Sequence, residues 1–259
     1  MPLPDGTYDI LKCVPLNDFK TVLDLGMGTG KASQYFLSHK KRVIASTYDL
    51  ESFKKKDNQR YRSKLRGIEL IACNAETLPF ANQSIEAVWA SHIIEHTRNV
   101  GLALDEINRI LKPNGWFFVA VPPHKTEIVG GHISVGWNIG QLLYTLINAK
   151  FNVREGHFVR HKYNIVAFVR KQAPFVLPKL IFAAEDILQL SKSGLLPDGL
   201  MLYKSKKGIP FFEGDIKAIN WPPPWISNST FKTTNGANSS KNLFRKLYKK
   251  CENLLCSRF

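Results

Sequence analysis

An acidic residue followed by three regularly spaced glycines is the part of the sequence whose residue types point most clearly to a ligand. Asp24 follows the apolar pair Val22-Leu23, and glycine then occupies positions 26, 28 and 30. Apolar residues before such a turn are typical of a buried parallel strand, and glycine lets a ligand approach the backbone closely. We therefore expect a nucleotide-like cofactor just beyond Leu25, at the carboxyl end of this strand.

Spacing separates the known kinds of glycine-rich nucleotide loop. A dinucleotide fingerprint that starts at Gly26 requires glycine at position 31, where the chain has Lys31. A P-loop that ends in Gly30-Lys31 requires glycine at position 25 and Ser or Thr at position 32, where the chain has Leu25 and Ala32. The pattern that remains is acid-x-Gly-x-Gly-x-Gly, and a glycine-rich turn without any ligand is its alternative.

This pattern resembles motif I of the class I S-adenosylmethionine-dependent methyltransferases. Three further stretches follow in the order found in the methyltransferase type 11 group. Residues 74–88 resemble the turn that contacts adenine and leads into the fourth strand, residues 91–96 the segment after that strand, and residues 111–116 the turn before the fifth strand. The resemblance covers about residues 20–170, and it implies an enzyme that uses S-adenosyl-L-methionine as cofactor.

The resemblance places cofactor contacts at the ends of successive strands. The backbone at Gly26, Gly28 and Gly30 is expected to approach the methionine and ribose parts of the cofactor, because no side chain intervenes. Asp24 is expected to organise the loop by accepting its N–H groups, or to receive the methionine ammonium through a water. Ser91, which follows the fourth strand, is also expected to bind the cofactor.

Two positions depart from the family pattern. Family spacing places the acid that binds the ribose hydroxyls near position 47, which is Thr47; we expect Asp49 to serve instead, on a slightly longer strand, with Glu51 or Thr47 as alternatives. Asn74 stands where Asp is common. Its amide oxygen can still accept from the adenine amino group, while the backbone N–H of Ala75 binds a ring nitrogen.

Histidines supply candidate bases, because an oxygen or nitrogen acceptor must lose a proton when it is methylated. His92 and His96 follow the fourth strand, and His124 and His132 follow the fifth. We name His92, His96 and His132 as catalytic candidates; a hydrogen-bonded or solvent-facing imidazole is the alternative for each. His92 and His96 would share a helix face, but the pattern lacks a third metal ligand, so no metal site is predicted.

The chemical class of the methyl acceptor is narrowed mainly by family motifs that this sequence lacks. Residues 90–93 lack the Asn/Asp-Pro-Pro-aromatic motif of amino-methyltransferases that act on bases, and Pro122-Pro123-His124 follows the wrong strand. No cysteine pair suggests cytosine chemistry. We therefore favour a small-molecule, glycan or lipid-linked acceptor over nucleic acid. An RNA methyltransferase and a non-catalytic S-adenosylmethionine-binding module are the alternatives.

The elements that position these residues alternate between strand and helix. Apolar runs predict strands at 21–25, 43–47, 68–72, 85–90 and 116–121, and helical spacing predicts helices at 31–39, 99–111 and 139–149. Residues 151–159 and 163–169 are predicted to form an antiparallel pair at the sheet edge. The result is an α/β fold with a doubly wound, Rossmann-like, seven-stranded, mostly parallel sheet and an antiparallel edge strand.

Three regions are predicted along the chain. Residues 1–20 form an entry segment near the cofactor mouth, residues 21–170 the methyltransferase domain, and residues 171–259 a basic C-terminal extension. In the extension, residues 175–191 have helical spacing, and residues 227–240 are rich in Ser, Thr, Asn and Gly, as flexible linkers are. Residues 241–256 read as a basic amphipathic helix that docks on the domain, joins a partner or lies on an anionic membrane surface.

Bulk composition adds a compartment and a class of partner. The formal net charge of +15 favours anionic partners, without choosing among nucleic acid, lipid headgroups and phosphorylated glycans. The sequence shows neither a run of eighteen apolar residues nor a basic, apolar leader pattern, and its four cysteines lack CxxC spacing. We expect a cytoplasmic protein, peripheral at the inner membrane surface if residues 241–256 bind lipid; its oligomeric state is left open.

Overall fold

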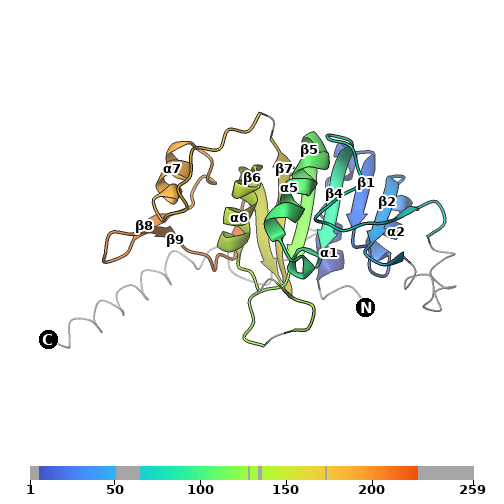
Figure 1. The fold of residues 1–259 in the computed structure, drawn as a ribbon, viewed down its shortest axis with the longest axis horizontal. Helices are drawn as coiled ribbons and strands as arrows, with labels where there is room; N and C mark the ends of the chain where they lie inside the picture. The colour runs from blue at the N-terminus through green and yellow to red at the C-terminus, as the bar shows by residue number, and fades with distance from the viewer. Residues whose placement is uncertain (1–5, 51–64, 128, 134–135, 173, 227–259) are drawn as a thin grey trace. The chain divides into compact units, whose positions relative to one another are not determined.

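The computed structural model describes residues 6–50, 65–127, 129–133, 136–172 and 174–226. Its central feature is an eight-stranded sheet with the order β10-β6-β7-β5-β4-β1-β2-β3 (Figure 1). The strands are β1 (Thr21–Leu25), β2 (Arg42–Thr47), β3 (Glu69–Ala72), β4 (Ile85–Ser91), β5 (Leu111–Val121), β6 (Phe151–His161), β7 (Asn164–Lys171) and β10 (Ala218–Ile219). The five neighbouring strands β3, β2, β1, β4 and β5 are parallel to one another. This arrangement confirms the predicted Rossmann-like α/β fold.

The antiparallel strand β7 is the third strand from the edge of the sheet, inside β6 and β10. It pairs antiparallel with β5 on one side and with β6 on the other. Strand β7 follows β6 after a turn at Lys162-Tyr163. The two strands form the antiparallel pair that the sequence predicts. The edge beyond β6 is formed by β10, which is also antiparallel. With two residues, β10 is too short to show an alternating pattern in the sequence.

One face of the sheet is covered by α5 (Val100–Ile110) and α6 (Ile139–Asn148), whose apolar stripes pack on aliphatic side chains of the central strands. Each helix begins at an asparagine that caps it. Asn99 accepts the N–H of Leu102 at 3.0 Å, and Asn138 accepts that of Gln141 at 2.8 Å. These caps satisfy backbone donors that the first helical turn leaves free.

The opposite face carries α2 (Lys31–Ser38) and a row of buried aromatic rings. Because side chains alternate along a strand, Trp89 and Phe118 point away from the face that their neighbours Val88 and Phe117 occupy. The row runs through Trp89, Phe36, Phe19, Phe118 and Phe168, with successive members in contact at centroid distances of 5.0 to 6.1 Å. The sheet is thus the middle of three layers, and its strand ends remain open for a site.

The helix predicted over residues 175–191 is wrong in its first two thirds. Only α7 (Asp186–Lys192) is helical, and Pro178, inside the predicted range, cannot donate the backbone N–H that a helix interior requires. The carboxylate of Asp186 instead accepts the N–H groups of Ile181 and Ala183 at 3.0 and 3.2 Å. A short hairpin of β8 (Leu202–Lys204) and β9 (Pro210–Phe212) follows.

The chain divides into two compact units, residues 1–223 and 224–259. The predicted linker 227–240 and amphipathic helix 241–256 lie outside the described residues, and the division at residue 170 stays a prediction. Among the described residues, the helices are too short or too polar to cross a bilayer. Cys13 and Cys73 are both free thiols.

Candidate active site

The three glycines after β1 all adopt the left-handed conformation that favours glycine, with φ of 69° at Gly26, 51° at Gly28 and 71° at Gly30. Their surroundings differ. A Cβ on Gly26 would lie 1.9 Å from Cδ1 of Ile93, and one on Gly30 would lie 2.8 Å from Cδ2 of Leu65. A Cβ on Gly28 would meet nothing within 4 Å. The space is therefore tightest at Gly26 and is limited at Gly30 by the end of one leucine side chain, whereas Gly28 presents bare backbone to open space.

The loop is anchored to the end of the neighbouring strand β2. The N–H of Gly26 donates to Oγ of Ser46 at 3.1 Å, and the N–H of Met27 donates to the carbonyl oxygen of Ser46 at 2.8 Å. Ser46 is buried and is not among the predicted site residues. The loop conformation is thus set by its neighbour in the sheet as well as by its own glycines.

Asp24 ties the end of β1 to the first turn of α2. Its carboxylate is buried and accepts the hydroxyl of Ser33 at 2.5 Å. Burial raises the pKa of Asp24 to about 6, against the opposing effect of hydrogen bonds from the hydroxyl and backbone N–H of Ser33. Of the two roles expected for Asp24, this geometry favours organising the loop; contact with the cofactor stays a prediction.

The end of β2 differs from the expectation for the ribose acid. The strand stops at Thr47, where it pairs with Ala72, so it is not extended as far as Asp49. Asp49 is exposed on the segment that follows, and Glu51 lies outside the described residues. The ribose role of Asp49 stays a prediction.

Asn74 forms a tight turn at the end of β3. Its side-chain oxygen accepts the N–H of Glu76 at 3.0 Å, and its carbonyl oxygen accepts that of Thr77 at 3.1 Å. Ala75 is nearly buried within this turn. Since an amide oxygen has two lone pairs, one remains for the adenine amino group predicted to bind here.

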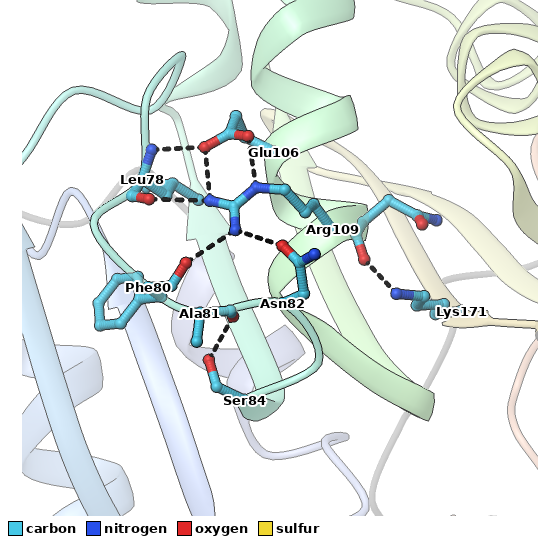
Figure 2. A network of polar contacts seen from close by, with 9 residues as sticks. Leu78, Phe80, Ala81, Asn82, Ser84, Glu106, Arg109 and Lys171 are labelled. Carbon is cyan, nitrogen blue, oxygen red and sulfur yellow. Dashed lines mark hydrogen bonds and ion pairs between the residues drawn. The ribbon is translucent and has the colours of Figure 1, made fainter.

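The chain after this turn is fastened to α5 by one arginine (Figure 2). Arg109 donates to the carbonyl oxygens of Leu78 and Phe80 at 2.9 and 2.7 Å and to Oδ1 of Asn82 at 2.8 Å. It also pairs with Glu106, which accepts the N–H of Leu78 at 2.7 Å. The hydrogen bond from Arg109 is the main cause that lowers the pKa of Glu106. This network fixes the chain next to the predicted adenine turn.

His92 leaves the end of β4 in a left-handed conformation, with φ of 56°, and its ring is held on both sides. Nε2 lies 3.0 Å from Oδ1 of Asn164, and Nδ1 lies 3.1 Å from Oε1 of Glu95. The ring stacks on Tyr163 at a centroid distance of 5.9 Å. Only 12% of the side chain is exposed.

Asn164 determines which nitrogen of His92 carries a proton. Its Nδ2 donates to the carbonyl oxygen of His161 at 3.1 Å, so its Oδ1 faces His92 and also accepts the hydroxyl of Thr7 at 3.1 Å. Nε2 of His92 is therefore a donor in this network. With Nε2 held by Asn164 and Nδ1 beside the carboxylate of Glu95, the geometry favours a positioning role for His92, and its role as a general base stays a prediction. Thr7 also places α1 (Thr7–Leu11) at this end of the sheet.

His96 and His132 lie side by side beyond β4 and β5. Their rings meet edge to face at 4.9 Å. Nδ1 of His96 lies 2.7 Å from the carbonyl oxygen of Gly131, so Nδ1 carries a proton and Nε2 has a free lone pair when the ring is neutral. Glu95 belongs to the same group: one ligand atom from each of Glu95, His96 and His132 lies within 4.8 Å of the others. Folding thus supplies the third potential ligand that the sequence pattern lacks.

Two hydroxyl groups at this end of the sheet are buried without a hydrogen-bond partner among the described residues. They belong to Ser91, the last residue of β4, and to Thr29 in the glycine loop. Buried hydroxyls are normally paired. The two groups therefore fit a polar ligand that lies across the ends of β1 and β4, which agrees with the predicted role of Ser91 without testing it.

Four residues that shape the site are absent from the prediction: Thr7, Ser46, Glu95 and Asn164. Glu95 had a local signal, because it lies three residues after His92 and the two side chains can meet within one helical turn. Thr7 and Asn164 lie 157 positions apart and meet only in the folded chain. No spacing rule in the sequence could have joined them.

The sequence matches known methyltransferases over a segment that contains the glycine loop, His92 and His96. Residues 23–119 match the family described as Methyltransferase domain. A demethylmenaquinone methyltransferase of Thermobifida fusca is 34% identical over 94 residues, which are 36% of this chain and 40% of the relative. A malonyl-[acyl-carrier protein] O-methyltransferase of Methylovorus sp. is 31% identical over 113 residues, or 41% of this chain and 37% of the relative. The chain thus spans about 40% of the length of these curated relatives.

The fold has a matching neighbour among solved structures. A chain from the complex between the Haloferax volcanii Trm112 methyltransferase activator and its putative methyltransferase superposes with a TM-score of 0.56. The match covers 66% of this chain and 90% of the other at 19% identity, so it supports the fold alone. The family match, rather than this superposition, identifies residues 23–119 as a methyltransferase segment of the class I, S-adenosylmethionine-dependent type.

Proposed function

We propose that this protein transfers a methyl group from S-adenosylmethionine to an oxygen or nitrogen atom of a small-molecule, glycan or lipid-linked acceptor. The observation that carries the proposal is the loop after β1, in which Gly26, Gly28 and Gly30 are all left-handed, Gly26 is packed against Ile93, and Gly28 faces open space. A loop held in this way presents backbone, rather than side chains, to a ligand.

The surrounding residues fit the cofactor. Gly26, Gly28 and Gly30 would hold its methionine and ribose parts, with Asp24 fixing the loop. Asp49 would bind the ribose, Asn74 and Ala75 the adenine, and the unpaired hydroxyl of Ser91 a polar group near the end of β4. When bound, S-adenosylmethionine supplies a methyl group on a positively charged sulfur.

The acceptor would lie over the ends of β4 and β5, against His92, His96 and His132. Much of the rate acceleration would come from holding the acceptor atom in line with the methyl group. The ring of His92 suits this positioning, since Asn164 holds its Nε2 and Tyr163 stacks on its face. His96 and His132 are the groups we propose to assist removal of the acceptor proton.

The names of two relatives support a small or carrier-bound acceptor. One relative is named for demethylmenaquinone and the other for malonyl-[acyl-carrier protein], so the shared segment does not select one acceptor. RNA is less favoured, although the net charge of +15 suits a polyanion. We place the reaction in the cytoplasm, with residues 241–256 as a contact to anionic membrane lipid, on the basis of their composition.

Transfer of label tests this function. The full-length protein is incubated with S-adenosylmethionine carrying a labelled methyl group and with separate extracts of small metabolites, glycans, lipids and RNA. We expect label in one of the first three fractions, and its loss with Gly28→Ala. Label in RNA would overturn the acceptor class, and cofactor binding without any transfer would favour a non-catalytic binding module.

A further inference from the structure

Glu95, His96 and His132 converge from two segments that are far apart in the sequence. Glu95 and His96 lie in the 3-10 turn Ile94–His96 after β4, and His132 lies in the loop after β5. One ligand atom from each side chain lies within 4.8 Å of the others. An ion bound about 2.1 Å from each ligand holds the ligand atoms about 3 to 4 Å apart, so small side-chain rotations would close the group around it.

The carboxylate of Glu95 gives independent evidence for a ligand. Its side chain is fully buried, and neither carboxylate oxygen accepts a hydrogen bond from the described residues. Nδ1 of His92 lies 3.1 Å from Oε1 without hydrogen-bond geometry, which makes an ion pair only when His92 is protonated. Buried carboxylates are normally hydrogen-bonded, paired or bound to a metal. Metal binding, shared with the neighbouring imidazoles of His96 and His132, would satisfy the carboxylate of Glu95.

The backbone holds the two segments together around the group. Nδ1 of His96 bonds the carbonyl oxygen of Gly131 at 2.7 Å, and the N–H of Ile133 donates to the carbonyl oxygen of Glu95 at 2.8 Å. The first bond leaves Nε2 of His96 as the ligand atom. An imidazole that donates its other N–H to a backbone carbonyl is the usual orientation of a metal-binding histidine.

We propose that Glu95, His96 and His132 bind a divalent transition-metal ion of the Zn²⁺ type. Two imidazole nitrogens and one carboxylate oxygen suit Zn²⁺ and its first-row neighbours, whereas Mg²⁺ and Ca²⁺ prefer oxygen ligands alone. Three protein ligands leave one position open, as in catalytic rather than structural zinc sites. His96 and His132 are then ligands, and they assist the reaction through the ion.

The role of the ion in catalysis rests on the proposed function, whereas its binding does not. An acceptor hydroxyl in the open position would have its pKa lowered by the cation. Its O–H bond breaks, the electron pair stays on the oxygen and the proton passes to water. The oxygen is then the nucleophile that the methyl group requires.

Metal titration of the full-length protein, first freed of metal by a chelator, tests the site. Calorimetry with Zn²⁺ should give one saturable site, and Co²⁺ should give a visible spectrum without a thiolate charge-transfer band. His96→Ala, His132→Ala and Glu95→Gln should each weaken Zn²⁺ binding by at least about 10- to 100-fold. His39→Ala is the matched control, because His39 is exposed at the end of α2 and should leave the affinity unchanged.

Absence of saturable Zn²⁺ binding, or an affinity unchanged by both His96→Ala and His132→Ala, would overturn the proposal. The exposed position of His96 keeps its variant informative even if Glu95→Gln disturbs folding. A parallel titration with S-adenosylmethionine separates the two proposals. Cofactor binding without Zn²⁺ binding overturns only the metal site, whereas Zn²⁺ binding without cofactor binding supports the metal site and contradicts the proposed function.

Discussion

The proposed cofactor side and the proposed acceptor side of the site are built from different kinds of contact. On the cofactor side, the loop after β1 is fixed mainly by backbone: left-handed glycines, and N–H groups that donate to Ser46. On the acceptor side, His92 is fixed by side chains, with Glu95 and Asn164 at its two nitrogens. The first arrangement presents one surface to a cofactor of fixed shape, and the second can change with the acceptor.

The family match covers the whole proposed cofactor side and only part of the proposed acceptor side, where it includes His92 and His96. The family match ends at residue 119, before His132, Tyr163 and Asn164. Those residues, together with Thr7, supply contacts around the acceptor histidines. Substitutions on the cofactor side should therefore alter binding of S-adenosylmethionine, whereas substitutions on the acceptor side should alter transfer and leave cofactor binding intact.

The largest effect is expected for Gly26→Ala. The new methyl group would overlap Ile93 and would require a left-handed alanine, which together cost about 2 to 5 kcal/mol of unfolding free energy. Gly28→Ala is the matched control for stability, because only the backbone penalty of about 1 to 2 kcal/mol applies there. Chemical denaturation measures both, and equal losses would contradict the packing role of Gly26.

Asp24→Asn should remove a pH dependence of stability from the cofactor side. The folded-state pKa of Asp24, about 6, lies above its ordinary 3.8. The stability it contributes is therefore fully present below pH 3.8 and is lost as pH rises through 6. Relative to Asp24→Asn, which can still accept from Ser33, the wild type should lose about 3 kcal/mol between pH 4 and 7. Denaturation curves that shift in parallel with pH would contradict the raised pKa.

Asn164→Ala probes the acceptor side. It leaves the hydroxyl of Thr7 and Nε2–H of His92 without their acceptor, which should cost about 1 to 3 kcal/mol of stability. The rate of methyl transfer should fall while the affinity for S-adenosylmethionine stays within about twofold of the wild type. Asn152→Ala, which removes a surface contact with Glu155, is the control. A large loss of cofactor affinity in Asn164→Ala would break the division between the two sides.

Arg109→Gln should loosen the chain beside the adenine turn. It removes hydrogen bonds to Leu78 and Phe80, and we expect a loss of about 1 to 2 kcal/mol of stability and weaker cofactor binding. Arg42→Gln breaks an exposed ion pair with Glu69 and should cost less than about 1 kcal/mol. Equal effects on cofactor affinity would show that the Arg109 network does not position the turn.

Asp49→Ala is expected to have the smallest effect on the fold, because the residue is exposed after β2. Its proposed contact with the ribose predicts a loss of affinity for S-adenosylmethionine of about tenfold, or 1.4 kcal/mol. Calorimetric titration measures this change. An unchanged affinity would move the ribose contact to Thr47 or Glu51.

The elements most accessible from sequence were those with a strong local pattern. The apolar run before Asp24 and the helical spacing at 139–149 predicted β1 and α6, because burial on a sheet or on one helix face imposes a period. In residues 175–185, the spacing of apolar residues wrongly predicted a helix. Pro178 and the turn around Asp186 favour irregular backbone there. β10 is too short to carry any pattern.

In the site as well, the parts with a local sequence pattern could be predicted, and the parts that depend on distant residues could not. The glycine loop could be predicted because its function requires glycine at fixed spacing within one turn. The surroundings of His92 could be predicted only in part, because Glu95 lies three residues away, whereas Asn164 contacts His92 from β7 and is itself bonded by Thr7 of α1. Convergence of that kind depends on strand order, and a single sequence records strand order only indirectly.

Calorimetric titration with S-adenosylmethionine, and in parallel with NAD, tests whether the glycine loop after β1 binds S-adenosylmethionine. The wild-type protein should bind S-adenosylmethionine at one site and give no heat of binding with NAD, and Gly28→Ala should bind S-adenosylmethionine at least about tenfold more weakly. Saturable binding of NAD, without binding of S-adenosylmethionine, would contradict the assignment of the glycine loop to S-adenosylmethionine.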